Sequence, residues 1–211
     1  MSGLAEINGY EDQYTYADML EWDEGYRAEI IDGALYAAEP PAAYHQEIIS
    51  ELTYQLMGFL KETQSVSGKP GKVFPGPFGV RLFPKDDLSD NTVLEPDITV
   101  VCDLSKLDKR GCKGAPDMII EILSPSNTQH DMVYKFNKYL KAGVREYWTV
   151  DGDSKSVQVH LLDQSNAQPR YITSLYGVFD PANPETVDGP DIVPVSVLPG
   201  CVIDLKEVFT A

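Results

Sequence analysis

Two acidic residues in the middle of the chain have types and surroundings that could support chemistry. Glu121 interrupts Met118–Leu123 (MIIEIL), a nearly continuous apolar run that predicts a central strand buried on both faces. Burying a carboxylate costs several kcal/mol unless a cation, a proton or a metal compensates it. The alternative is a half-solvated Glu121 at a strand end, beside Ser124 and Pro125.

Asp97 is the second candidate, because Pro96-Asp97 opens the short apolar strand 96–102. An aspartate at such a position is also an ordinary turn residue. Asp117 opens the Glu121 strand after Pro116, but four residues of strand separate it from Glu121 by about 13 Å, which is too far to share one metal. Asp97, on a different strand, could lie beside Glu121.

The helix that follows Glu121 offers three lysines. With its apolar face centred on Phe136 and about 100° per residue, Lys135 lies on the flank of that face. Lys138 and Lys141 are expected to point to solvent, so only Lys135 could reach back to the sheet. A solvated Lys135 is the alternative.

Two further residues could complete a site. His45 begins the inward stripe of the helix 43–62, where a hydrogen-bonded core or rim histidine is the alternative to a ligand. Glu29 lies near the Asp32-Gly33 turn, where a solvent-facing strand glutamate is the alternative.

Two carboxylates on neighbouring strands and one lysine can together hold Mg²⁺, which prefers oxygen ligands and retains waters. Such an ion polarises a phosphoryl oxygen and lowers the pKa of its bound water. The lysine could orient or deprotonate that water, or stabilise charge on phosphorus.

The elements that must position these residues alternate between strands and helices. Asp32-Gly33 predicts a tight hairpin turn, and Gly143 predicts a helix C-cap. Helices are expected from an N-cap at Thr15 to about Asp23, over 43–62, and from the end of the turn 124–128 to about Ala142. Strands are expected over 26–38 (hairpin), 73–84 (an irregular pair), 96–102, 118–123, 144–151, 155–162 and 170–178. The order predicts a mixed α/β fold with a parallel crossover over 118–150.

Length and composition exclude several classes. The 211 residues favour one domain over 1–211, with a core at about 10–165 and C-terminal strands over 166–211. No apolar run approaches a membrane span, and three cysteines without metal-type spacing favour a reducing cytoplasm.

The net charge of −16 opposes nonspecific nucleic-acid binding. Two basic stretches, at 69–85 and 106–113, could form local basic edges, although solvated loop charges are the alternative for each.

Four stretches, EPDITVV, DMIIEILSPSN, the helix carrying Asp131, Lys135 and Tyr139, and AGVREYWTVD, resemble the Uma-two family of restriction-endonuclease-like proteins. That family belongs to the PD-(D/E)XK nuclease superfamily. The upstream YRAEIIDGALY and the His45 helix also match, so the resemblance covers roughly residues 10 to 165.

The resemblance implies a restriction-endonuclease-like core, with a central mixed β-sheet flanked by α-helices, and a DNA endonuclease that uses Mg²⁺ or Mn²⁺. It implies Asp97 and Glu121 as metal ligands and catalytic residues, with the Ile122 carbonyl as a further ligand. The superfamily lysine slot holds Leu123, and Lys135 matches the lysine that this family carries on the following helix. Glu29 and His45 occupy positions typical of the family.

A second hypothesis is non-enzymatic: an acidic homo-oligomeric interaction or regulatory module on a nuclease scaffold. The acidic balance and the aromatic content favour a protein–protein surface, so a homodimer is expected under either hypothesis. The intact set of Asp97, Glu121 and Lys135 distinguishes the two, since a scaffold without catalysis needs no buried glutamate.

Overall fold

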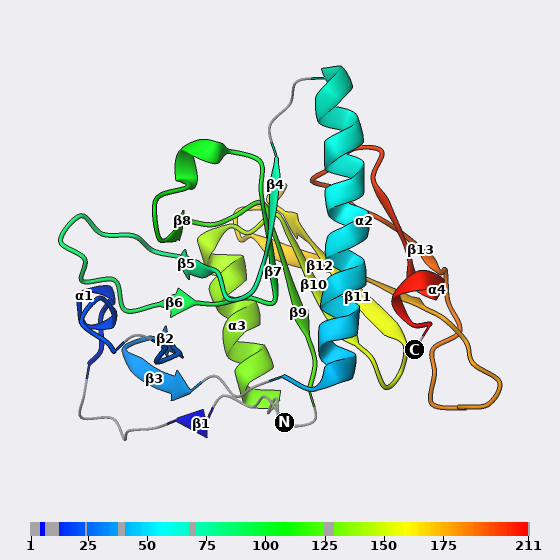
Figure 1. Cartoon of the computed structure of the whole chain (residues 1–211), viewed down its shortest axis with the longest axis horizontal. Coiled ribbons are helices and arrows are strands. Elements are labelled where there is room, and N and C mark those ends of the chain that lie inside the picture. The colour runs from blue at the N-terminus through cyan, green and yellow to red at the C-terminus, as the bar shows by residue number, and fades with distance from the viewer. Residues whose placement is uncertain are drawn as a thin grey trace.

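The computed structural model describes residues 5–6, 13–23, 25–37, 41–67, 71–124 and 129–210. Its centre is a six-stranded sheet in the order β12-β11-β10-β9-β7-β4, here called the central sheet (Figure 1). These strands are β12 (Arg170–Gly177), β11 (Ser156–Asp163), β10 (Glu146–Asp151), β9 (Met118–Ile122), β7 (Ile98–Val101) and β4 (Lys72–Pro75).

The central sheet is mixed, because β9 and β10 run parallel while the other neighbouring strands are antiparallel. The helix α3 (Gln129–Ala142) connects the parallel pair, as the strand–helix–strand pattern predicts. The predicted α/β class with a central mixed sheet is therefore confirmed.

A second six-stranded sheet was not foreseen. Its order is β1-β3-β2-β6-β5-β8, and its strands are β1 (Ala5–Glu6), β3 (Ala34–Ala37), β2 (Ala28–Ile31), β6 (Val93–Leu94), β5 (Gly79–Arg81) and β8 (Gly111–Lys113). The expected β2–β3 hairpin is present, and both Asp32 (φ 52°) and Gly33 (φ 87°) have the positive φ that its tight turn requires.

Two hydrophobic clusters cover the two faces of the central sheet, since successive strand side chains point to opposite faces. Ile120 and Trp148 pack on the face of α2 (Ala43–Ser67), whereas Ile119 and Tyr147 pack on the face of α3 and the second sheet. Figure 1 accordingly shows α2 and α3 on opposite sides of the central strands.

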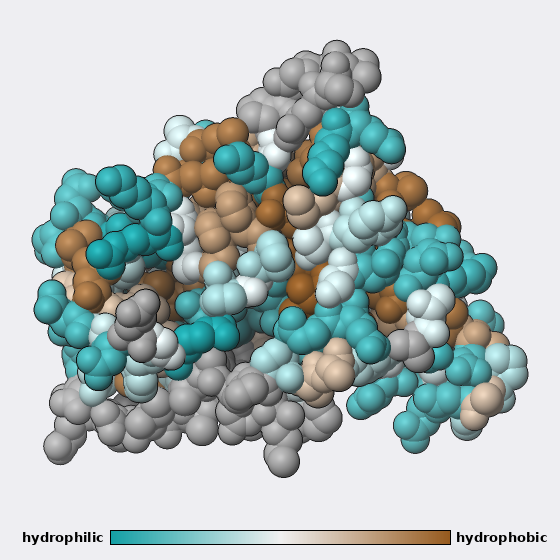
Figure 2. Space-filling view, in the orientation of Figure 1, coloured by the Kyte–Doolittle hydropathy of each residue, from teal (hydrophilic) through white to brown (hydrophobic). Residues whose placement is uncertain are grey.

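The inward stripe predicted for α2 is present, and the side of the helix turned outward in Figure 2 is mostly hydrophilic. The helix ends at Ser67 rather than at about Glu62. No glycine or proline interrupts residues 59–67, so nothing in that stretch favours an earlier end.

Two other boundaries differ from prediction. The first helix, α1 (Tyr16–Met19), has the expected Thr15 cap but stops well before Asp23, because the following amides bond three residues back in tight turns. The expected strand pair at 73–84 does not pair: β4 joins β7 in the central sheet, and β5 joins β6 and β8 in the second.

The C-terminal residues extend the core. The strand β12 adds an edge to the central sheet, and β13 (Ile192–Pro194) pairs with β14 (Val202–Asp204) ahead of α4 (Leu205–Val208). Their apolar side chains join the cluster on the α2 face. Among the described residues, no helix has both the length and the apolar character needed to cross a membrane.

Candidate active site

Asp97 and Glu121 meet because of strand register. The antiparallel pairing of β7 and β9 sets Ile98 opposite Ile120, and one further step sets Asp97 opposite Glu121. Their neighbours along the strands, Ile98, Ile120 and Ile122, point to the α2 face. Because successive strand side chains point to opposite faces, both carboxylates lie on the face that α3 covers. The two predicted carboxylates are thus brought together at one end of the two strands.

Asp97 is held by two groups. Its Oδ2 accepts a hydrogen bond from the Ile122 backbone N–H at 2.8 Å and lies 3.4 Å from His45 Nε2. Burial acts to lower the pKa of His45, but Asp97 and the Ile122 carbonyl outweigh it and raise that pKa. The structure therefore places His45 at the end of α2 that meets Asp97.

Glu121 is buried beside two donors on α3. Its Oε1 lies 3.1 Å from Lys135 Nζ and accepts a hydrogen bond from the Tyr139 hydroxyl. Burial raises the pKa of Glu121 to about 7, while Lys135 and Tyr139 act in the opposite direction. A carboxylate so poorly compensated at neutral pH is one that a further cation would stabilise.

Lys135 links Glu121 to Glu29. Its ammonium lies 3.1 Å from each carboxylate, and Glu29 is fixed by the Glu95 backbone N–H at 2.7 Å. Burial alone would lower the pKa of Lys135, but these two carboxylates and Asp97 raise it well above its usual range. Lys135 therefore stays an ammonium at neutral pH.

The residues present fit a divalent cation by donor type and by charge. Glu29, Asp97 and Glu121 all offer oxygen atoms, and Glu121, with its pKa of about 7, is only partly ionised at neutral pH until a further cation stabilises its charge. In the described part of the chain no three His, Cys, Asp or Glu side chains converge on one metal position. Asp97, Glu121 and the Ile122 carbonyl would leave places for water and a substrate phosphate, as Mg²⁺ prefers.

The remaining candidates lie elsewhere. Asp117 pairs with Arg145 and accepts the Cys102 backbone N–H, so it ties loops together at the far end of β9. Lys138, expected to face solvent, instead pairs with Asp32 in the β2–β3 turn, and its side chain is 13% exposed. The prediction omitted the second sheet, which approaches this flank of α3.

Tyr139 is the site residue that sequence reasoning missed. It belongs to the motif that resembles the family, but the sequence assigns it no role in the site, whereas in the structure it is fully buried and its hydroxyl donates a hydrogen bond to Glu121. Its position one helical turn after Lys135 is the signal that could have found it, because residues four apart share a helix face. Asp131, quoted in the same pattern, lies outside the residues whose side chains are described.

Comparison with solved structures identifies the fold. The chain superimposes with a TM-score of 0.66 on a crystal structure described as "a putative nuclease belonging to DUF820" from Anabaena variabilis ATCC 29413. The identity is 22%, over 93% of this chain and 98% of that one. The architecture is therefore that of a nuclease-like α/β fold.

The family follows from the sequence. The model of the Uma2 family, described as "Putative restriction endonuclease", matches residues 15–200. The chain belongs to this family, as the resemblance indicated. A search of curated proteins gives no match.

Proposed function

We propose that this protein is a metal-dependent endonuclease of the PD-(D/E)XK type that hydrolyses phosphodiester bonds in DNA. The observation that carries the proposal is the Lys135 ammonium, whose side chain is only 12% exposed and which is held between Glu29 and Glu121 on the sheet face that Asp97 shares. Family membership supports a nuclease, and the carboxylate-rich site supports a metal.

Asp97, Glu121 and the Ile122 carbonyl would hold Mg²⁺ or Mn²⁺. The bound ion would polarise a phosphoryl oxygen and lower the pKa of a coordinated water. Two groups keep Asp97 in place: His45 contacts its carboxylate, and the Ile122 backbone N–H donates a hydrogen bond to it. Asp97 is thereby held in place before substrate arrives, which reduces reorganisation during the reaction.

Lys135 acts as a cation rather than as a base. Because Glu121 and Glu29 raise its pKa, it has no free lone pair at neutral pH. A protonated Lys135 can orient the attacking water or stabilise charge on phosphorus, but it cannot deprotonate the water. Glu29 positions Lys135 from the second sheet.

The setting we propose is a reducing cytoplasm, since Cys102, Cys112 and Cys201 are free thiols. We also propose a homodimer.

Cleavage by purified variants tests the site. Plasmid and oligonucleotide DNA are incubated with Mg²⁺ or Mn²⁺, and Asp97→Asn, Glu121→Gln and Lys135→Met are each expected to cut at least about 100-fold more slowly than wild type. EDTA should abolish wild-type cleavage.

Lys138→Met provides the matched control, because it removes a lysine from the same helix that pairs with Asp32 outside the site. This variant should cut like wild type, and far-UV circular dichroism should be unchanged in all four. Wild-type rates in any two of the three site variants would overturn the assignment.

A further inference from the structure

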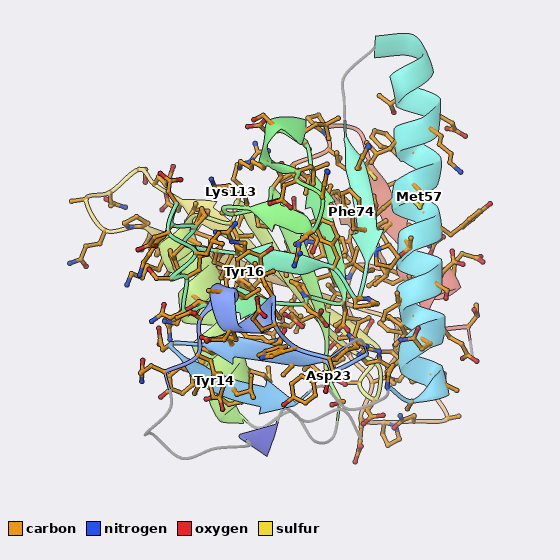
Figure 3. All side chains as sticks on the ribbon, turned by 60° about the vertical axis from the view of Figure 1, so that its left-hand side comes forward. Tyr14, Tyr16, Asp23, Met57, Phe74 and Lys113 are labelled. Carbon is orange, nitrogen blue, oxygen red and sulfur yellow. The ribbon has the colours of Figure 1, made fainter. Side chains whose placement is uncertain are left out.

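A groove of about 650 Å³ lies beside the candidate site, between the α1 region, the second sheet and the turn after β4. Figure 3 shows Tyr16, Asp23 and Phe74, three of its lining residues, around this region. Five aromatic side chains line it: Tyr16, Trp22, Tyr26, Phe74 and Phe78. A volume in this range suits one small planar ligand rather than a protein surface.

The aromatic rings form two pairs. Trp22 and Tyr26 meet edge to face with centroids 5.1 Å apart, and Phe74 stacks on Phe78 at 4.1 Å. Tyr26 is 46% exposed although it is large and apolar. The groove therefore offers ring faces and edges to a planar partner.

Four cations accompany the rings. Arg27 pairs with Glu95, and Arg81 pairs with buried Asp90 while covering the Tyr16 ring at 4.2 Å. Lys109 and Arg110 are exposed and form no ion pair with any carboxylate in the described ranges.

Three carboxylates, those of Asp23, Glu95 and Asp108, also line the groove. Glu95 is neutralised by Arg27, and Asp108 Oδ1 accepts the backbone N–H groups of Arg110 and Gly111. Lys109 and Arg110 together outweigh the adjacent Asp108 by one formal positive charge, which suits a phosphate in a chain whose overall charge is −16.

The groove shares a wall with the candidate active site. Glu95 turns its side chain to Arg27 in the groove, while its backbone N–H holds Glu29 in the site. Gly76, next to the lining residue Pro77, donates its N–H to the Asp97 carbonyl. Glu95 and the Gly76–Asp97 hydrogen bond therefore connect the groove to the candidate site.

We infer that this groove binds an unpaired nucleotide of a single-stranded nucleic acid, with its base on the Trp22–Tyr26 side and its phosphate at Lys109 and Arg110. The inference rests on the proposed function and names its substrate class. Base–aromatic stacking tolerates any sequence but needs an unstacked base, which a closed duplex does not present.

Oligonucleotide binding without metal tests the inference independently of cleavage. In EDTA, a fluorescein-labelled single-stranded 12-mer is titrated by anisotropy, and tryptophan emission is followed with an unlabelled one. The chain has two tryptophans, and Trp148 is fully buried, so the quenching expected on binding reports Trp22. Trp22→Phe should lose the quenching but keep most of the affinity.

Affinity should fall on the order of tenfold in Trp22→Ala and in Arg110→Ala. Lys61→Ala is the matched control, because it removes one exposed charge from α2 outside the groove and should bind like wild type. The same sequence as a duplex should bind at least tenfold more weakly.

Wild-type affinity in both Trp22→Ala and Arg110→Ala, or equal affinity for the duplex, would overturn the inference. The two proposals fail separately. If the protein cleaves with metal and groove variants do not change the rate, the inference about the groove is wrong and the proposed nuclease activity stands. If the groove variants weaken binding but no metal supports cleavage, the inference about the groove stands and the proposed nuclease activity is wrong.

Discussion

Glu121 shares one oxygen between a charged and a neutral donor, Lys135 and Tyr139. The lysine supplies positive charge, and the hydroxyl supplies a hydrogen bond that favours the ionised form. Both come from one face of α3, one helical turn apart. Burial raises the pKa of Glu121, and these two donors of α3 act against that rise.

Tyr139→Phe is predicted to shift the acid limb of the pH–rate profile to higher pH. Burial already raises the pKa of Glu121 to about 7, and the Tyr139 hydrogen bond acts to lower it. Removing the hydroxyl therefore raises that pKa further, so that less of the metal-binding carboxylate form exists at a given pH. Initial cleavage rates between pH 5.5 and 9 measure the shift; an unmoved limb would contradict the role of Tyr139.

Sequence reasoning could find residues whose chemistry conflicts with their surroundings. Glu121 was visible because a carboxylate interrupts an apolar strand, and Lys135 because it flanks an apolar helix face. Tyr139 and Lys138 were not, because tyrosine is an ordinary core residue and the partner of Lys138 lies 106 positions away on another sheet. The local periodicity of a sequence does not predict contacts between segments that are far apart along the chain.

At the scale of elements, α3 is docked on the central sheet by a cluster of rings. Phe136 lies edge to face with Tyr171 and His160, both at 5.1 Å, and His160 stacks on Tyr147 at 5.2 Å. Desolvation in this cluster lowers the pKa of His160 to about 4. The histidine of β11 is therefore neutral in the folded protein at physiological pH.

We predict that acid destabilises the protein partly through His160. Its folded pKa lies below its unfolded value of about 6.5, so the unfolded chain binds the extra proton and stability is lost as pH falls from about 6.5 to about 4. Between pH 7.5 and 5 this amounts to about 2 kcal/mol, which His160→Gln should largely remove. Urea unfolding of wild type and His160→Gln at pH 7.5 and pH 5 measures this loss of stability. An equal loss in the two proteins would contradict the prediction.

Elements with strong local signals were predictable, and short ones were not. The β2–β3 hairpin, β9, β10 and the end of α3 followed from turn residues and apolar runs. The strands β6 and β8 span two and three residues, so they exist only through their neighbours in the second sheet. Because local signals do not predict these partners, the pattern at 73–84 predicts a strand pair that does not form.

At the scale of the molecule, the net charge of −16 opposes nonspecific DNA binding, and we propose the edge of the central sheet as the place where two copies of the chain meet. The edge strand β12 exposes Ile172 and Leu175 by about half, and Phe179 follows close behind. An unpaired edge with exposed apolar side chains is a common place for strands of two chains to meet.

The predicted homodimer should have twice the 23.4 kDa mass of one chain in light scattering coupled to size exclusion. Ile172→Lys combined with Leu175→Lys should shift the mass to that of one chain if β12 forms the contact. A single-chain mass for wild type at micromolar concentration would contradict the dimer.

The central claim is that Asp97 and Glu121 hold a divalent metal, and Mn²⁺ binding followed by EPR tests it most directly because it needs no substrate. Wild type and Lys138→Met are predicted to bind Mn²⁺ alike at pH 8, and Glu121→Gln and Asp97→Asn to lose at least tenfold in affinity. Equal Mn²⁺ affinity in wild type and Glu121→Gln, or no binding by wild type at millimolar Mn²⁺, would contradict the claim and favour a non-catalytic acidic module.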